Sequence, residues 1–228
     1  MAIQLPSHSP LAQQRRLQQL KMAIAVCVAI LLVRVLLTIL LEYRWYIPPN
    51  FDASAFLGGR RYTFFGLYRV AFYVHIASGP VAIILASFLL LSGGRSRSRQ
   101  WHRRSGRVLA LLVPLLLAPS GLVMARYAYA GPPAALGFAA LSLLTCAALL
   151  LSVHYARVRK FRLHRRWAER CWLFLVSPLI LRLMAGVSIV AGIEATWTYQ
   201  FNAWASWLIP WIGYELWHRK RYKNDENR

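Results

Sequence analysis

Long apolar segments alternate with short arginine-rich segments along this chain. The arginine-rich segments cover residues 95–107, 157–166 and 219–223, and stretches long enough to cross a bilayer lie between them. A hydrocarbon core of about 30 Å needs roughly 20 apolar residues in a helix. The pattern therefore predicts an all-α, polytopic membrane protein with a helical bundle. Its expected spans are residues 22–41, 69–92, 107–126, 134–155, 168–191 and 200–217.

The six expected spans leave no length for a separate soluble domain. The longest connection, residues 42–67, is too short for a core of its own. We therefore expect a polar cytoplasmic tail at 1–21, one six-span transmembrane domain at 22–217, and a basic cytoplasmic tail at 218–228. Within that domain, spans two to five are expected to form a four-helix core.

Charge supports this organisation and fixes an orientation. The chain has 28 Lys and Arg against 7 Asp and Glu, a net charge of +21. In a soluble protein this excess would indicate nucleic-acid binding, but here it is concentrated in connections between spans. Cationic connections stay on the cytoplasmic side, so both termini are predicted to lie inside. The basic loops would meet anionic lipid headgroups, and no nucleic-acid partner is expected.

Two arginines and one histidine fall well inside the expected spans. Arg34, Arg182 and His75 all lie at a similar depth toward the outer side. An ionisable group there is costly and marks a functional-site hypothesis. No Asp or Glu shares that depth in the first five spans, so the arginines need another partner. A ligand with carboxylate or quinone oxygens would serve, as would Glu42 and Glu194 at the rim. The alternative is that the arginines snorkel or bond carbonyl oxygens.

His75 by itself is compatible with two roles. A neutral imidazole inside a helical bundle is a candidate haem ligand. A bis-histidine haem would need a second histidine at the same depth, and the sequence has none, although Met124 and Met184 lie in the outer halves of their spans. The alternative is a histidine hydrogen-bonded to a neighbouring helix.

A repeated motif stands on the cytoplasmic side. His102-Arg103-Arg104 precedes the third span, His164-Arg165-Arg166 precedes the fifth, and His154 ends the fourth. The repetition indicates a pseudo-two-fold axis along the membrane normal. Three histidines among guanidinium groups could ligate haem or a metal, with Arg103 and Arg165 holding propionates or lipid phosphates. The alternative is a solvated basic face that binds anionic lipid. The candidate metal ligands are His75, His102 and His164.

Other chemistries find no support in the sequence. Cys27, Cys146 and Cys171 share no metal or redox spacing and are expected to pack as small apolar residues. No acid–base carboxylate pair, activated nucleophile or phosphate-binding glycine loop is visible, which argues against a hydrolase or transferase. Whether the protein is an enzyme stays open.

The histidine and arginine boxes together resemble a known family. Over residues 69–191 the chain is similar to bacterial predicted membrane proteins of domain of unknown function 2306. The resemblance implies a bacterial plasma (inner) membrane location and a four-helix core similar to the b-type haem membrane cytochromes. Lacking a second outer histidine, this chain would bind at most one haem. The matching residues are His75, His102, Arg103, Gly106, Arg107, His164, Arg165, Arg166, Trp167, Arg170 and Arg182.

Two hypotheses for function follow. The first is an electron-transfer protein that binds a single haem b or a quinone, with His75 or the set His102, His154 and His164 as iron ligands. The second is a non-catalytic subunit or assembly protein that docks on a larger complex and binds anionic lipid. A small-molecule transporter ranks third. For the second, a tryptophan stripe at helical spacing would face the partner, formed by Trp204, Trp207 and Trp211.

Overall fold

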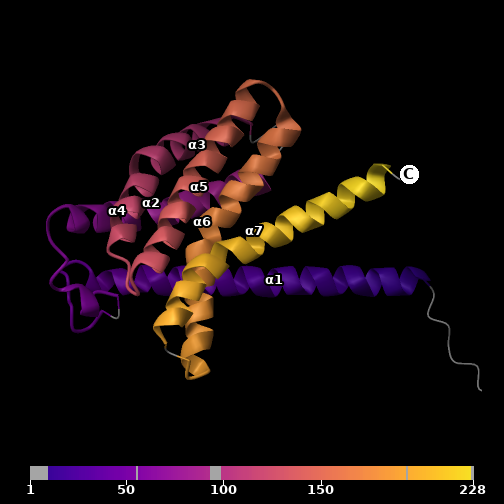
Figure 1. The fold of residues 1–228 in the computed structure, drawn as a ribbon. Helices are drawn as coiled ribbons and strands as arrows, with labels where there is room; N and C mark the ends of the chain where they lie inside the picture. Colours follow the sequence, from indigo (N-terminus) through magenta and orange to yellow (C-terminus); the bar gives the residue numbers. More distant parts are fainter. Residues whose placement is uncertain (1–9, 55, 93–98, 194, 227–228) are drawn as a thin grey trace, which may run out of the picture. The chain divides into compact units, whose positions relative to one another are not determined.

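The computed structural model describes residues 10–54, 56–92, 99–193 and 195–226, and all the regular structure in these ranges is helical (Figure 1). The chain divides into two compact units at Tyr43 and Arg44, and each is described by itself. The first contains α1 (Pro10–Glu42), a single apolar helix. It begins well before residue 22, so part of the expected polar tail at 1–21 is helical.

The second unit is a bundle of long helices joined by short connections. The helices are α2 (Gly66–Leu91), α3 (Arg99–Leu112), α4 (Ala118–Arg126), α5 (Pro132–Arg157), α6 (Phe161–Val190) and α7 (Thr196–Glu226). A π-helical segment, η4 (Val113–Leu117), joins α3 to α4. α2 packs on α3, α4 and α6, and α5 packs on α4, α6 and α7. The expected four-helix core is thus confirmed, with α3–η4–α4 as one of its members.

Five helices are long and apolar enough to cross a membrane, within the part of the chain that the structure describes. They are Gln13–Trp45, Gly66–Leu91, Arg99–Arg126, Pro132–Arg157 and Phe161–Val190. The protein is therefore a multi-pass helical membrane protein. The sixth expected span, 200–217, forms the middle of α7 but does not reach the same apolar content, so its crossing stays a prediction.

The bundle core lies between all the helices of the second unit. Val113, Ala82, Ala148 and Cys171 are almost fully buried there. The outward faces carry many exposed apolar residues, such as Leu91, Leu111 and Val187. A surface of this kind suits acyl chains rather than water. The expectation that the cysteines pack as small apolar residues holds for Cys171, which is buried, whereas Cys146 is half-buried and Cys27 is exposed on α1.

The tryptophan stripe of α7 packs against the bundle, with Trp207 buried and Trp204 and Trp211 half-buried. Trp207 is 3% exposed and its ring meets Phe174 edge-on. Trp204 donates its indole N–H to the Pro133 carbonyl at 2.9 Å. A Cβ at Gly137 would lie 3.0 Å from the Trp204 Nε1, so this glycine lets α5 and α7 approach closely. The stripe thus holds α7 on α5 and α6, and a partner at its half-buried members stays a prediction.

The connection before α2 folds into a cap rather than a loose loop. It contains the short 3₁₀ helices η1 (Tyr43–Trp45) and η2 (Gly58–Arg60). Tyr46, Leu57 and Phe64 are buried, and the rings of Tyr46 and Phe64 lie edge-on to Phe72 of α2. The segment is too short for an independent core, as expected. Its buried side chains instead form a core together with Phe72 of the bundle.

Candidate functional site at the basic end

Two of the predicted histidines make the same contact at one end of the bundle. We call this end, where α2 and α5 finish and α3 and α6 begin, the basic end. His164 Nδ1 lies 2.9 Å from the Ser152 carbonyl oxygen and 3.0 Å from Ser152 Oγ. A carbonyl oxygen only accepts, so Nδ1 must carry the hydrogen. In the neutral ring the lone pair is then on Nε2.

His102 repeats this arrangement in the other hairpin. Its Nδ1 lies 3.3 Å from Ser92 Oγ, and the Ser92 hydroxyl points to the Leu89 carbonyl at 3.5 Å. The Ser92 hydroxyl can accept a hydrogen from Nδ1, and in that tautomer the lone pair of the neutral ring is on Nε2. The two half-buried rings interact electrostatically across the bundle. The histidine of each His-Arg-Arg motif therefore closes its helical hairpin through a contact with a serine. This contact gives the histidine a role that is separate from the positive charge of the arginines.

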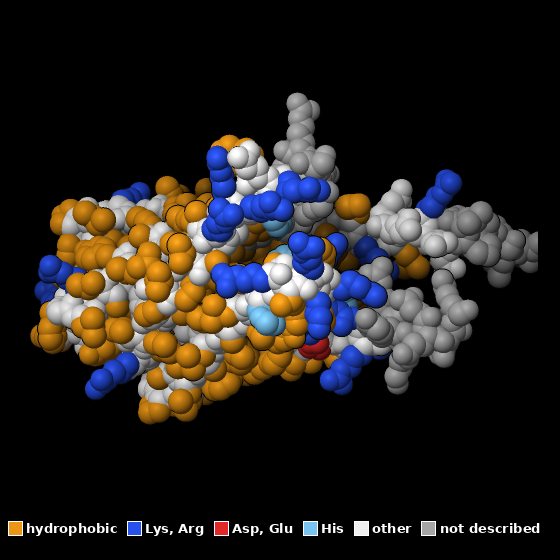
Figure 2. Space-filling view, turned by 90° about the horizontal axis from the view of Figure 1, so that it is seen from above, with side chains coloured by type: hydrophobic (Ala, Val, Ile, Leu, Met, Phe, Trp, Pro, Cys, Tyr) orange, Lys and Arg blue, Asp and Glu red, His pale blue; other side chains and the backbone are white. Residues whose placement is uncertain are grey.

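Arginines surround these histidines. Figure 2 shows Lys and Arg side chains gathered around histidine side chains on one part of the surface. Arg103 and Arg104 are exposed, and the Arg104 guanidinium lies 5.8 Å from the Trp101 ring centre. Arg165 is 79% exposed and donates to Glu169 at 2.9 Å. Of the two arginines predicted to hold propionates, Arg103 keeps its donors available, whereas Arg165 already has a carboxylate partner.

His154 does not join this pair. Its side chain is exposed and its ring meets that of the neighbouring Tyr155. Among the residues that the structure describes, no three His, Cys, Asp or Glu side chains form a group that could hold a metal ion. The predicted sets of three histidines are thus not assembled among the described residues, whereas His102 and His164 lie at the same end of the bundle, each against its own serine.

His75 occupies a different site inside the bundle. Its Nδ1 lies 3.2 Å from Ser120 Oγ, and Ser120 donates to the Leu116 carbonyl at 2.6 Å. The contact crosses from α2 to α4, just after the π-helical turn of η4. A Cβ at Gly121 would lie 2.6 Å from Ser142 Oγ and 3.3 Å from His75 Cε1. This geometry matches the interhelical hydrogen bond that was the alternative to haem ligation.

Within the bundle, Arg182 does not share the buried surroundings of His75. Arg182 is exposed on α6 and interacts electrostatically with Tyr199 of α7. Arg34 is exposed on α1, whose unit is described by itself. A long guanidinium side chain on a bundle surface reaches toward the headgroups instead of a closed interior. The idea of one buried layer that combines His75 and Arg182 therefore loses its basis.

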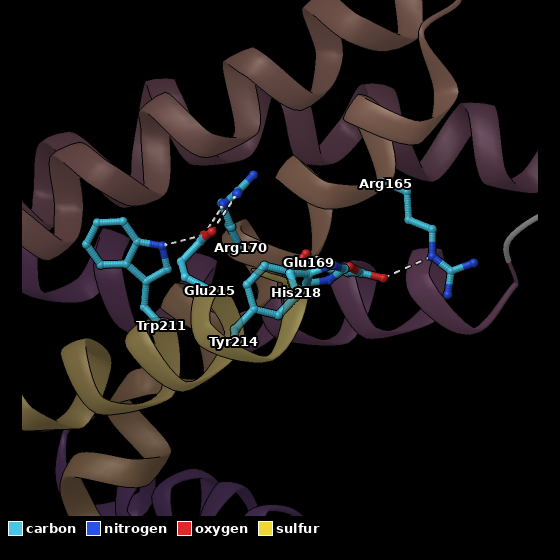
Figure 3. A network of polar contacts seen from close by, with 7 residues as sticks. All are labelled: Arg165, Glu169, Arg170, Trp211, Tyr214, Glu215 and His218. Carbon is cyan, nitrogen blue, oxygen red and sulfur yellow. Dashed lines mark hydrogen bonds and ion pairs between the residues drawn. The ribbon is translucent and has the colours of Figure 1, made fainter. Parts of the chain in front are cut away.

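Sequence reasoning missed a polar network between α6 and α7 (Figure 3). Arg170 donates to Glu215 through Nε at 2.6 Å and Nη2 at 3.0 Å, and Trp211 donates to the same carboxylate at 3.1 Å. Tyr214 donates to Glu169 at 2.7 Å. Glu215 falls within the expected sixth span, 200–217. Arg170 and Glu215 lie at similar depths in the expected spans 168–191 and 200–217, and this similarity could have indicated that they form a pair.

The fold and the basic end together define a class of protein. It is a multi-pass helical membrane protein whose two core hairpins each carry a histidine in contact with a serine at a basic end.

The chain belongs to the DUF2306 family, described as predicted membrane proteins, which it matches over residues 72–218. That match reaches beyond the expected 69–191 core and includes α7 up to His218. The curated proteins and the solved structures gave no match to this chain.

Proposed function

We propose that this protein binds one haem b between His102 and His164 and takes part in electron transfer at the inner membrane of a bacterium. The single observation that carries the proposal is the repeated Ser–His contact at the basic end. Nδ1 of each ring lies against a serine near the end of the preceding helix, which directs Nε2 of each ring away from that contact. A bound haem iron would exchange single electrons at this end of the bundle.

The surroundings of the two rings fit such a ligand. Histidine ligands of metals commonly donate their other N–H to a carbonyl or hydroxyl, which fixes the ring orientation, and Ser152 and Ser92 supply these acceptors. Haem propionates need cations, and the exposed Arg103 offers one beside His102. His75 has a serine partner too, but no second histidine at its depth.

An optical spectrum of the detergent-purified full-length protein tests this proposal. We expect a Soret band that shifts to longer wavelength on reduction, together with distinct α and β bands, and the loss of these bands in His102→Ala and in His164→Ala. His154→Ala is the matched control, since this exposed histidine lies at the same end and should leave the spectrum unchanged. No Soret band after expression with added haem precursor and loading with haemin would overturn the haem assignment. Loss in His75→Ala alone would move the ligand to that site.

A second candidate function rests on the exposed arginines. Arg103, Arg104 and Arg107 line the start of α3 and all are exposed. A cluster of this kind at a cytoplasmic membrane surface attracts anionic headgroups, each cation contributing about 1 kcal/mol. The protein would then be a lipid-binding, non-catalytic subunit of a larger complex.

Native mass spectrometry separates this second candidate from the first. A subunit should keep a stoichiometric partner and bound phosphatidylglycerol, and triple substitution of Arg103, Arg104 and Arg107 by Gln should release the lipid. A purified protein that carries neither partner nor lipid excludes it. If the purified protein contains quinone and no haem, its electron-transfer role would depend on the quinone instead of on haem.

A further inference from the structure

A row of polar side chains is buried along the first part of α7, and the proposed haem site does not use it. Thr198, Asn202 and Ser206 are 8%, 4% and 1% exposed. Their spacing of four residues places them on one side of the helix. This side faces α6, because Ser206 Oγ lies 3.1 Å from Oγ of Ser177, which is 0% exposed. We call these four residues the polar seam.

Two polar groups of the polar seam lack hydrogen bonds that a membrane interior requires. The Thr198 hydroxyl is buried and has no hydrogen-bond partner among the described residues. Pro210 lies inside α7 and has no N–H, so it does not donate to the Ser206 carbonyl as a residue four positions on does in a regular helix. An unsatisfied polar group away from water is costly, so both groups call for partners from outside the chain.

Water fits the spacing of the polar groups on α7. Successive side chains of the polar seam are four residues apart on this helix, which is about 6 Å along its axis. That is twice the roughly 2.8–3.0 Å of an ordinary hydrogen bond, so one water can bridge each step. A buried water needs about two to four polar partners. The Asn202 amide supplies N–H donors and a carbonyl acceptor in the middle of the row.

The side of α6 that faces the polar seam leaves room for water near the start of α7. The two helices run antiparallel, as the Ser177–Ser206 contact and the network of Figure 3 show. This register brings Ala185, eight residues after Ser177, level with Thr198, eight residues before Ser206. Ala185 is half-buried and its side chain ends at Cβ. It therefore leaves more space beside Thr198 than a long apolar side chain would.

Aromatic rings close the other end of the polar seam. Trp207 directly follows Ser206, and its ring centre lies 6.2 Å from that of Phe174. The Phe174 ring also packs against Trp211 at 5.8 Å. Phe174 and Trp207 are each 3% exposed. Packed rings offer water too few polar partners, so a path for water along the polar seam would begin at the start of α7 and end at these rings.

We propose that the polar seam binds a chain of ordered waters and forms a hydrated inlet between α6 and α7. The inlet opens at the end of the bundle opposite the basic end and stops at the contact between Phe174 and Trp207. Its waters hydrogen-bond the Thr198 hydroxyl, the Asn202 amide and the Ser206 carbonyl. The inlet is separate from the proposed haem site and does not depend on it.

Reaction of single cysteines with silver ions in the full-length protein tests the inlet. The variants lack the three native cysteines and are purified in neutral detergent. Thr198→Cys and Asn202→Cys should react at least roughly tenfold faster than Ala203→Cys, because a dry buried thiol reacts only after local opening. Ala203 is the matched control, since it is 0% exposed on the same helix and its carbonyl lies 3.2 Å from a Cβ placed at Gly137 of α5. Equal rates for Asn202→Cys and Ala203→Cys would overturn the proposal.

The melting temperature of Asn202→Leu is a second test, which stays decisive if the cysteine variants do not fold. Leucine is close to asparagine in shape but makes no hydrogen bond. Around a hydrated amide, leucine removes hydrogen bonds to water, so Tm should fall by about 2–4 °C. In a dry interface, leucine removes an unsatisfied amide instead, and Tm stays unchanged or rises. An unchanged or higher Tm would therefore contradict the hydrated inlet.

Discussion

Breaking the Arg170–Glu215 pair should cost far more stability than breaking the neighbouring Arg165–Glu169 pair. Arg170 and Glu215 meet through two charge-assisted hydrogen bonds of 2.6 and 3.0 Å, with side chains only 17% and 29% exposed. Removing one partner of a fully buried pair costs about 3–5 kcal/mol, because the other charge is left uncompensated. Partial exposure lowers this, so we expect about 2–3 kcal/mol for Arg170→Gln or Glu215→Gln.

The comparison pair has the same chemistry in a different environment. Arg165 and Glu169 are joined by a 2.9 Å contact at i,i+4 spacing, and the Arg165 side chain is 79% exposed. Solvent screening limits such pairs to about 0.3–0.5 kcal/mol. Arg165→Gln therefore serves as the control on the same helix.

The assay is equilibrium unfolding by SDS in mixed micelles, followed by tryptophan fluorescence and circular dichroism. The double variant Arg170→Gln/Glu215→Gln should cost no more than either single variant, because the coupling energy of the pair is lost only once. Equal costs for Arg170→Gln and Arg165→Gln would refute the reasoning. So would strict additivity of the two single variants, since it would mean that the two side chains do not interact.

Three further outcomes follow from packing and from charge. Gly121→Ala should destabilise by about 1–3 kcal/mol in the same unfolding assay, since its Cβ would meet Ser142 Oγ at 2.6 Å, and adding Ser142→Ala should recover part of the loss. Trp207→Ala should cost about 3–5 kcal/mol because the ring is 3% exposed, and a cost below 1 kcal/mol would mean that α7 does not depend on it. In a cysteine-free background, Tyr129→Cys should react with an impermeant maleimide on intact cells and Lys160→Cys only after permeabilisation. The reverse pattern would contradict the orientation predicted from charge.

The sequence was sufficient for the spans because their physical requirement is simple. A helix that crosses a bilayer needs a fixed apolar length, and the expected 69–92 and 134–155 agree closely with α2 and α5. The start of α6 was placed at 168, seven residues after Phe161. Residues 161–167 contain the basic His-Arg-Arg motif. They are helical but not apolar, so the apolar segment in the sequence does not include them.

Packing partners were less predictable than spans. The stripe of Trp204, Trp207 and Trp211 is visible in the sequence, but its periodicity does not say which neighbour it meets. Only the position of α7 on α5 and α6 shows that it closes the bundle. The same holds for Arg182, whose depth could be counted along its span, whereas its exposure depends on the rotation of α6.

The contacts between the histidines and their serine partners could not be predicted from the sequence, for a geometric reason. His102 and His164 stood out through their repeated motif, but Ser92 lies ten residues before His102, and Ser152 lies twelve residues before His164. At that separation two residues meet only if the chain reverses between two helices. The sequence predicts both hairpins but not how tightly they close, so it does not pair these residues.

The repeated Ser–His contact could serve to close a hairpin or to orient a ligand, and the two roles ask for different atoms. Closure needs only the N–H at Nδ1, directed in His164 to the Ser152 carbonyl oxygen. Ligation needs in addition the lone pair at Nε2. Asparagine places an N–H donor near the position of Nδ1 and has no counterpart of Nε2. His102→Asn and His164→Asn should therefore keep the free energy of unfolding within about 0.5 kcal/mol of wild type. If these variants also keep the Soret band, the histidines only close the hairpins. If they lose it while the fold is retained, the contact orients a ligand.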